Sequence, residues 1–149
     1  MRKGDIGLTD LINETSVKKS DPRVRALAYL DDLNAALGFA KLKSKEADLG
    51  ALQKHLSAVC AAVAGGKADP AGAVNFIEKI TAALQKTVKT PKSFAAPGNT
   101  EAETALHLAR AKCRLAETYL AELPSQNMDI LRFINRLSLY LFLLALKRA

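Results

Sequence analysis

The chain has 149 residues, of which 49% are hydrophobic, and its 22 basic against 15 acidic residues give a net charge of +7. This length suits one domain spanning residues 1–149, and two cysteines exclude a disulfide framework and fit the reducing cytoplasm. The charge favours an anionic partner: a nucleic acid, a phosphorylated metabolite or a membrane surface. The first residues lack the apolar core of a signal peptide, and the apolar run at 137–146 is too short to span a bilayer.

Residues 1–20 lack helical periodicity, so we expect a loop there. Asp21-Pro22 then places a capping residue before a proline, which is typical of a helix start, and Asp69-Pro70 repeats it. Thr100 and Glu103 have the spacing of a capping box. No strand-like alternation is present. The sequence predicts an all-α bundle of five helices, at residues 22–43, 45–66, 71–88, 101–123 and 127–147.

Polar side chains fall where we expect the interior of this bundle. The last helix is apolar on nearly all sides from residue 130 to 146 and should lie at the centre, yet Asn135 interrupts it. A buried amide without partners costs about 1–3 kcal/mol, so Asn135 needs one. Asp31 and Arg110 would pair inside the bundle, because a lone buried charge is too costly. For Asp31 a solvated position is an equally good interpretation.

A polar face also runs along the predicted fourth helix. His107, Arg110, Arg114 and Glu117 follow one another at steps of three, four and three residues. Taken alone, this pattern is more simply a solvated surface, and His107 is more simply a structural histidine than a ligand.

The N-terminal loop has the composition of an anion site. Gly4 and Gly7 let the backbone approach a ligand, and backbone amides with Lys3 can hold an anion, although the Walker pattern is absent. The two histidines and two cysteines do not have metal-ligand spacing, so we expect no metal held by side chains. Nucleic-acid binding has the charge but lacks interleaved aromatic residues and a recognisable module.

Six segments of the chain together have the pattern of one family. They are MRKGDIGLT (1–9), VKKSDPRV (17–24), DDLN (31–34), FAAPGN (94–99), HLARAKCRLAE (107–117) and INRLSL (134–139). Taken together and in order, they resemble the ATP:cob(I)alamin adenosyltransferases of the propanediol-utilisation type. The departures from the family pattern are Met1 and Lys3 in place of threonine, Asn99 in place of glycine, Leu115 in place of a second arginine and Leu139 in place of aspartate.

This resemblance implies a homotrimer of ferritin-like helical bundles with each active site between neighbouring subunits. Residues 1–20 would be a nucleotide-binding loop, Mg²⁺ would bridge phosphate oxygens, and Asp31 would keep Arg110 aimed at the polyphosphate. Phe94 would lie against the corrin ring and exclude water and the lower axial base from cobalt. The residues implied to hold ATP are Gly4, Asp5, Gly7, Thr9, Lys19, Arg110, Arg114, Glu117 and Asn135, and those implied in catalysis are Arg110, Arg114, Asp31 and Phe94.

The implied activity is transfer of the 5′-deoxyadenosyl group from ATP to cob(I)alamin, which forms adenosylcobalamin and releases triphosphate. The protein partners implied are a cobalamin reductase or a cobalamin-dependent mutase, with no nucleic acid and no membrane. Because Leu115 and Leu139 remove polar groups from the nucleotide side, the alternative is a protein of the same fold that binds or delivers cobalamin or ATP without chemistry. A basic helical scaffold for nucleic acid is a third hypothesis, supported by the charge alone.

Overall fold

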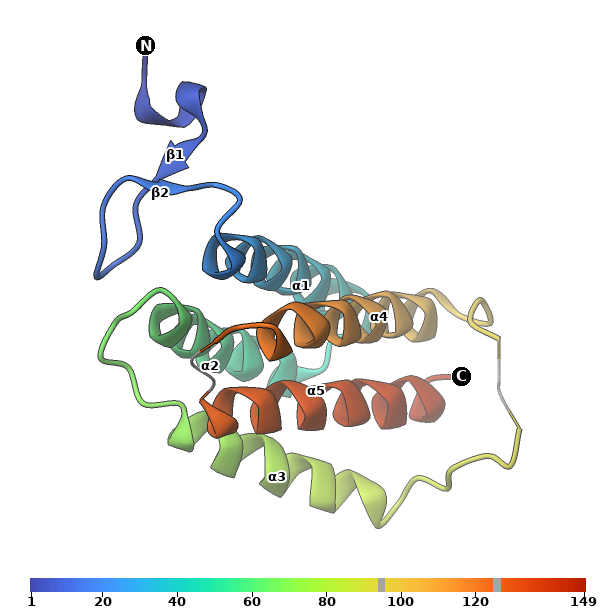
Figure 1. The fold of residues 1–149 in the computed structure, drawn as a ribbon. Coiled ribbons are helices and arrows are strands. Elements are labelled where there is room, and N and C mark those ends of the chain that lie inside the picture. Colours follow the sequence, from blue (N-terminus) through green and yellow to red (C-terminus); the bar gives the residue numbers. More distant parts are fainter. Residues whose placement is uncertain (94–95, 125–126) are drawn as a thin grey trace.

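The structure, a computed structural model, describes residues 1–93, 96–124 and 127–149. Among the described residues five α-helices form a bundle, as the sequence predicts, whereas residues 1–20 hold short elements where a loop is expected (Figure 1). There a short 3-10 helix η1 (Lys3–Ile6) precedes strands β1 (Leu8–Thr9) and β2 (Val17–Lys18), which are too short to leave an alternating pattern in the sequence. The helices are α1 (Pro22–Ser44), α2 (Ala47–Val63), α3 (Ala71–Gln85), α4 (Glu101–Ala121) and α5 (Met128–Lys147).

Local capping signals set where the helices begin. The Asp21 carboxylate accepts the backbone N–H of Arg23 at 2.8 Å, with Pro22 in the first turn of α1. At the start of α4, the Thr100 hydroxyl accepts the Glu103 N–H at 3.0 Å while the Glu103 carboxylate accepts the Thr100 N–H at 3.3 Å. The predicted starts at Asp21 and Thr100 are confirmed because each depends only on neighbouring residues, and α3 begins at Ala71, directly after Asp69-Pro70.

The helices pack in a ring. α4 lies between α1 and α5, α3 covers the other side of α5, and α2 packs on α1 and completes the ring against α3. The core of this ring is apolar, and α5 buries Phe133, Ile134, Leu137 and Leu141 in it. Asn135 is exposed, so the expectation that α5 is enclosed on all sides within the chain is wrong: one of its faces points outward.

The N-terminal segment is attached at one end of this ring. β1 and β2 are antiparallel, with Leu8 opposite Lys18 and Thr9 opposite Val17. Val17 and Leu11 pack on Ala64, beyond the end of α2. Figure 1 shows that the rest of the segment projects beyond the start of α1, away from the middle of α4 and α5.

Candidate functional site

The polar face of α4 carries two cations without a carboxylate partner. Arg110 is half-buried and Arg114 is exposed one turn later, and neither guanidinium forms an ion pair with any described residue. Burial and the nearby charge of Arg114 lower the pKa of Arg110. Glu117, half-buried, lies a further turn along α4. Two neighbouring guanidiniums that repel each other are suited to binding a polyanion such as a triphosphate.

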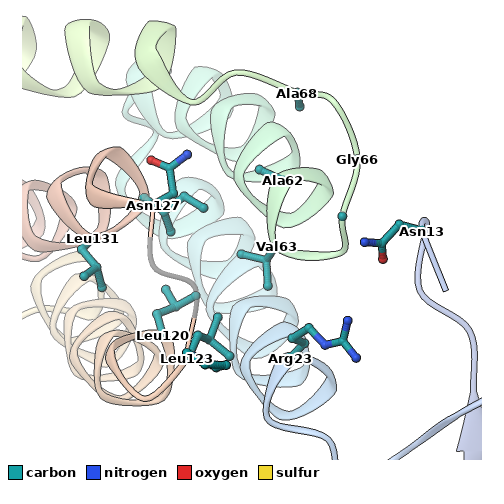
Figure 2. A pocket seen from close by; sticks show the side chains of 13 residues that line it. Asn13, Arg23, Ala62, Val63, Gly66, Ala68, Leu120, Leu123, Asn127 and Leu131 are labelled. Atoms are coloured by element: carbon teal, nitrogen blue, oxygen red, sulfur yellow. The ribbon is translucent and has the colours of Figure 1, made fainter.

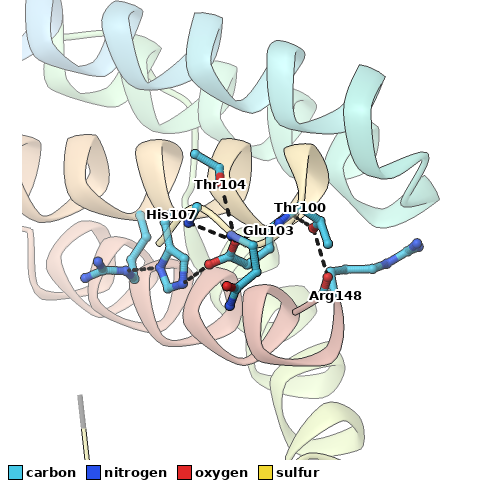
Figure 3. A network of polar contacts seen from close by, with 8 residues as sticks. Thr100, Glu103, Thr104, His107 and Arg148 are labelled. Atoms are coloured by element: carbon cyan, nitrogen blue, oxygen red, sulfur yellow. Dashed lines mark hydrogen bonds and ion pairs between the residues drawn. The ribbon is translucent and has the colours of Figure 1, made fainter. Parts of the chain in front are cut away.

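Arg110 is held by a buried polar network (Figure 3). Its Nε donates a hydrogen bond to Nδ1 of His107 at 3.1 Å, and Nε2 of His107 lies 3.5 Å from Oε1 of Glu103. Both His107 and Glu103 are buried. The sequence predicts a cap for Glu103 and favours a structural role over a ligand role for His107. The signal for their connection to Arg110 is the helical spacing of 103, 107 and 110.

The other oxygen of Glu103 holds the chain that enters α4. Oε2 accepts the backbone N–H groups of Gly98, Asn99 and Thr100 at 3.2, 2.9 and 3.3 Å. Burial acts to raise the pKa of Glu103. The three N–H donors together lower this pKa by more than burial raises it, so the net shift is downward. Glu103 is therefore a charged carboxylate that fixes residues 98–100 to α4.

The predicted loop residues gather around one turn. Gly7 ends η1 with φ 77°, in the left-handed region that glycine adopts without strain. The Lys19 ammonium donates a hydrogen bond to the Gly4 carbonyl at 3.0 Å, and Asp5 accepts the Arg2 N–H at 2.8 Å. Thr9 belongs to β1. Gly4, Asp5 and Gly7 are exposed, so the turn presents its backbone and a lysine to the outside.

The structure does not bring this turn to the arginines of α4 within one chain. The turn lies beyond the start of α1, whereas Arg110 and Arg114 lie in the middle of α4 (Figure 1). Asn135, on α5, is exposed rather than buried among hydrogen-bond partners. One chain thus carries two separate groups of the predicted ATP residues.

The expected pair between Asp31 and Arg110 inside the bundle is not formed among the described residues. Asp31 is exposed and borders a cavity of about 330 Å³ between α1 and α2, near Asn34 and Cys60. Instead, the adjacent Asp32 forms an ion pair with Lys112 of α4, with 2.7 Å between Oδ2 and Nζ. Successive helical residues point about 100° apart, so only one of two adjacent aspartates faces α4.

Two of the positions that depart from the family pattern, Leu115 and Leu139, lie on α4 and α5. Leu115 is exposed on α4, and Leu139 is half-buried beside Arg136 in a groove between α3 and α5. Phe94 lies outside the described residues.

A cavity of about 630 Å³ lies at the end of the bundle, between the α2–α3 connection and the start of α5 (Figure 2). Its described lining mixes apolar residues with the polar side chains of Asn13, Arg23 and Asn127. The charged residue among them, Arg23, is already bound to Asp21 at 2.8 Å and Glu14 at 2.9 Å. None of the predicted ATP residues lines it. The cavity therefore does not coincide with the predicted site.

Two further properties of the described residues bear on metal binding and on membrane insertion. No three histidine, cysteine, aspartate or glutamate side chains among them are grouped so as to hold a metal ion. None of the described helices combines the length and the apolar character that crossing a membrane requires.

Comparison with known proteins gives a consistent result. The sequence model of the cobalamin adenosyltransferase family matches residues 1–148. The corrinoid adenosyltransferase PduO of Salmonella typhimurium is 35% identical over 159 residues, and that of Citrobacter freundii is 37% identical over 160 residues. Each alignment covers 97% of this chain but only 47% and 48% of the relative, so the chain spans about half the length of these curated relatives.

Solved structures agree in fold. A variant of the PduO-type ATP:corrinoid adenosyltransferase from Lactobacillus reuteri, complexed with cobalamin and ATP, has a TM-score of 0.87 and 29% identity, covering 97% of this chain and 87% of that chain. Another variant of that enzyme, complexed with ATP, has a TM-score of 0.86 and 31% identity, covering 97% and 90%.

Proposed function

This chain belongs to the cobalamin adenosyltransferase family, and from that premise we propose that it transfers the 5′-deoxyadenosyl group of ATP to cob(I)alamin. Cobalt attacks C5′ of ATP, so the cobalt–carbon bond forms while the C5′–oxygen bond breaks and triphosphate leaves. The nucleophile comes with the substrate. The protein has to align cobalt with C5′ and to stabilise the triphosphate that leaves.

The observation that carries this proposal is the pair of guanidiniums on α4 without carboxylate partners. Arg110 and Arg114 are placed to bind the triphosphate as negative charge develops on it. The turn formed by Gly4, Asp5 and Gly7, with Lys19 behind it, binds the nucleotide through its backbone and its cation. Thr9, Glu117 and Asn135 complete the nucleotide contacts in this proposal.

We further propose that the site is completed between copies in a homotrimer. The loop group and the α4 group lie apart in one chain, so ATP contacts both only if they come from neighbouring subunits. Exposed apolar side chains support such an interface: Leu108 and Leu115 recur on one face of α4, and Phe39 and Leu42 lie on α1 beside it. Asp31 of one copy then pairs with Arg110 of the next.

The remaining proposals concern the setting of the reaction. Mg²⁺ enters as the complex with ATP, coordinated by phosphate oxygens. A cobalamin reductase supplies the electrons that generate cob(I)alamin in the cytoplasm, and a cobalamin-dependent mutase takes up the product.

A single-turnover assay tests the activity. The protein is mixed anaerobically with chemically reduced cobalamin and ATP, and adenosylcobalamin is followed by its absorbance together with release of triphosphate. Formation of both in equal amounts supports the transferase. Binding of cobalamin and ATP without turnover supports the alternative, a non-catalytic binding or delivery protein, which Leu115 and Leu139 favour because they remove polar groups from the site.

The corrin side is tested at Phe94, whose assignment comes from its place in the FAAPGN segment. An apolar ring against the corrin excludes water and the lower base, so Phe94→Ala reduces formation of base-off cob(II)alamin more than it weakens ATP binding. Absorbance and electron paramagnetic resonance spectra of bound cob(II)alamin measure the first effect, and calorimetric titration with ATP measures the second. Unchanged spectra would remove Phe94 from the corrin site.

A further inference from the structure

Arg110 is the only one of the two α4 guanidiniums whose orientation is fixed by a side chain among the described residues. Its Nε donates to Nδ1 of His107 at 3.1 Å, and Arg114 has no such contact. An arginine has five N–H donors and no acceptor, so Nδ1 of His107 must be the acceptor and must be unprotonated. The neutral imidazole then carries its hydrogen on Nε2, the atom that lies 3.5 Å from Oε1 of Glu103.

This arrangement leaves the far edge of the guanidinium free. Nη1 and Nη2 of Arg110 make no hydrogen bond to any described residue. A long side chain that is held through Nε loses much of its rotamer freedom before a ligand binds, and its planar fork then points in one direction. The two terminal nitrogens are the pair that binds phosphate oxygens in a bidentate manner.

The same network reaches the segment that enters α4. Oε2 of Glu103 accepts the N–H groups of Gly98, Asn99 and Thr100, which follow Phe94 in the chain. Oε1 of that carboxylate faces His107. A displacement of residues 98–100 thus moves Glu103, and with it the imidazole on which Arg110 rests (Figure 3).

Resting on the proposed function, we propose that Glu103 and His107 are positioning residues, which aim the guanidinium of Arg110 at the triphosphate and connect it to the corrin-side segment at residues 98–100. Burial lowers the pKa of His107, as does Arg110, and Glu103 acts in the opposite direction, so the imidazole stays in the neutral form that the geometry requires.

Two amide substitutions separate the two ends of the imidazole. In His107→Asn the amide occupies the position of Nδ1 and can still accept from Arg110, whereas in His107→Gln it occupies the position of Nε2 and cannot. We expect His107→Gln to lower kcat/KM for ATP about 100-fold, with the KM for cobalamin unchanged, and His107→Asn to stay within about tenfold of the wild type. Thermal melts confirm that each variant is folded.

A double-mutant cycle with Arg110→Ala tests whether His107 acts through Arg110. The 100-fold effect of His107→Gln should vanish when Arg110 is already alanine. An equal loss in both backgrounds, or equal losses for His107→Asn and His107→Gln in folded proteins, would overturn the proposal. If His107→Gln does not fold, Glu103→Gln takes its place in the same cycle. The new amide N–H group would face the Nε2–H of His107, so the contact that holds the imidazole is lost, while the amide oxygen still caps α4.

The wild type distinguishes this inference from the proposed function. A wild type that does not turn over contradicts the transferase activity itself. The positioning role is then decided by binding: His107→Gln should weaken the binding of inorganic triphosphate about tenfold in calorimetric titration, and His107→Asn should not. Equal triphosphate affinities for the wild type and His107→Gln would overturn the positioning role whether or not the enzyme is active.

Discussion

Lys112 of α4 forms an ion pair with Asp32 of α1, and this contact leaves Asp31, the adjacent residue, on the exposed side of α1. The two aspartates therefore have different tasks. Asp32 joins two helices of one chain, and Asp31 is the one that pairs with a neighbouring copy in the proposed homotrimer. One substitution at each position separates stability within the chain from assembly between chains.

We predict opposite profiles for Asp32→Asn and Asp31→Asn. Because the Asp32–Lys112 pair is partly exposed, Asp32→Asn lowers the free energy of unfolding by at most about 1 kcal/mol and leaves the oligomer intact. Asp31→Asn leaves unfolding of the isolated chain unchanged but shifts dissociation of the oligomer to higher protein concentration. Urea denaturation measures the first quantity and sedimentation equilibrium the second. A wild type that is monomeric at micromolar concentration would contradict the homotrimer.

The same two residues show where sequence reasoning stops. The helix starts at Asp21 and Thr100 are predictable because the capping interactions are local. Which of two adjacent aspartates faces α4 depends on the rotation of α1 in the assembled bundle, and neither residue's neighbours in the chain fix that rotation. The buried pairing of Asp31 with Arg110 is therefore wrong for one chain, whereas the equally good interpretation, a solvated Asp31, agrees with its exposed position.

The sequence predicted which residue types form the candidate site, but only some of the contacts between them. The spacing of Arg110, Arg114 and Glu117 places them on one face of α4, as helical periodicity requires. Asn135 was misjudged, because the apolar sequence of α5 does not reveal that one of its faces lies outside the chain's own core. The contact between His107 and Arg110 needs the actual rotamers, which periodicity does not supply.

Removing Arg114 and removing Arg110 from α4 should have different effects on the stability of the fold. Arg114 is exposed and forms no ion pair with any residue that the structure describes, so Arg114→Ala changes the free energy of unfolding by less than about 0.5 kcal/mol. Its loss removes a donor from the triphosphate and raises the barrier by about 2.7–4 kcal/mol, a factor of about 10²–10³ in kcat. Arg110→Ala also removes the donor that His107 accepts, which costs about 0.5–1.5 kcal/mol of stability.

Melting curves and turnover rates on both variants check this prediction. Lys54→Ala is the matched control, since it removes an exposed cation from α2, away from the arginines. Wild-type turnover by Arg114→Ala would show that the polar face of α4 does not bind the triphosphate. A loss of more than about 3 kcal/mol in Arg110→Ala would instead indicate that Arg110 itself forms a fully buried ion pair, which the structure does not show among its described residues.

The two cysteines should differ in reactivity. Cys60 is half-buried, and burial, with a smaller effect of Asp31, raises its pKa to about 11. Cys113 is fully buried and donates a hydrogen bond to the Ile134 carbonyl at 3.2 Å, and burial raises the pKa of its thiol further. At pH 8 we expect slow alkylation of Cys60 and none of Cys113 in the folded protein. Mass spectrometry of alkylated peptides measures both rates.

The control is the same labelling in concentrated denaturant, where both thiols are exposed and should react at similar rates. Equal labelling of Cys60 and Cys113 in the folded chain would contradict the packing of α4 against α5, because Cys113 lies in that contact.

Mild acid should destabilise the protein through His107. Burial lowers the pKa of His107 below its ordinary value of 6.5, and Arg110 lowers it further, while Glu103 opposes both. As the pH falls below 6.5, the unfolded chain therefore binds a proton at this residue before the folded chain does, and stability is lost progressively until the folded pKa is passed. The groups that face the ring are Glu103 and Arg110 on α4 and the Phe142 ring on α5, with 6.4 Å between ring centroids.

His107→Asn removes this titration and so serves as the control. Urea denaturation at pH 7.5 and 5.5 should show a smaller loss of stability in His107→Asn than in the wild type. The pKa of Glu103 is also lowered, but from an ordinary value of 4.5, so its contribution is lost only at lower pH and does not obscure the result. Equal losses of stability in the two proteins would mean that His107 titrates alike in the folded and unfolded chain. That result would contradict a neutral imidazole that accepts a hydrogen bond from Arg110 and holds it in place.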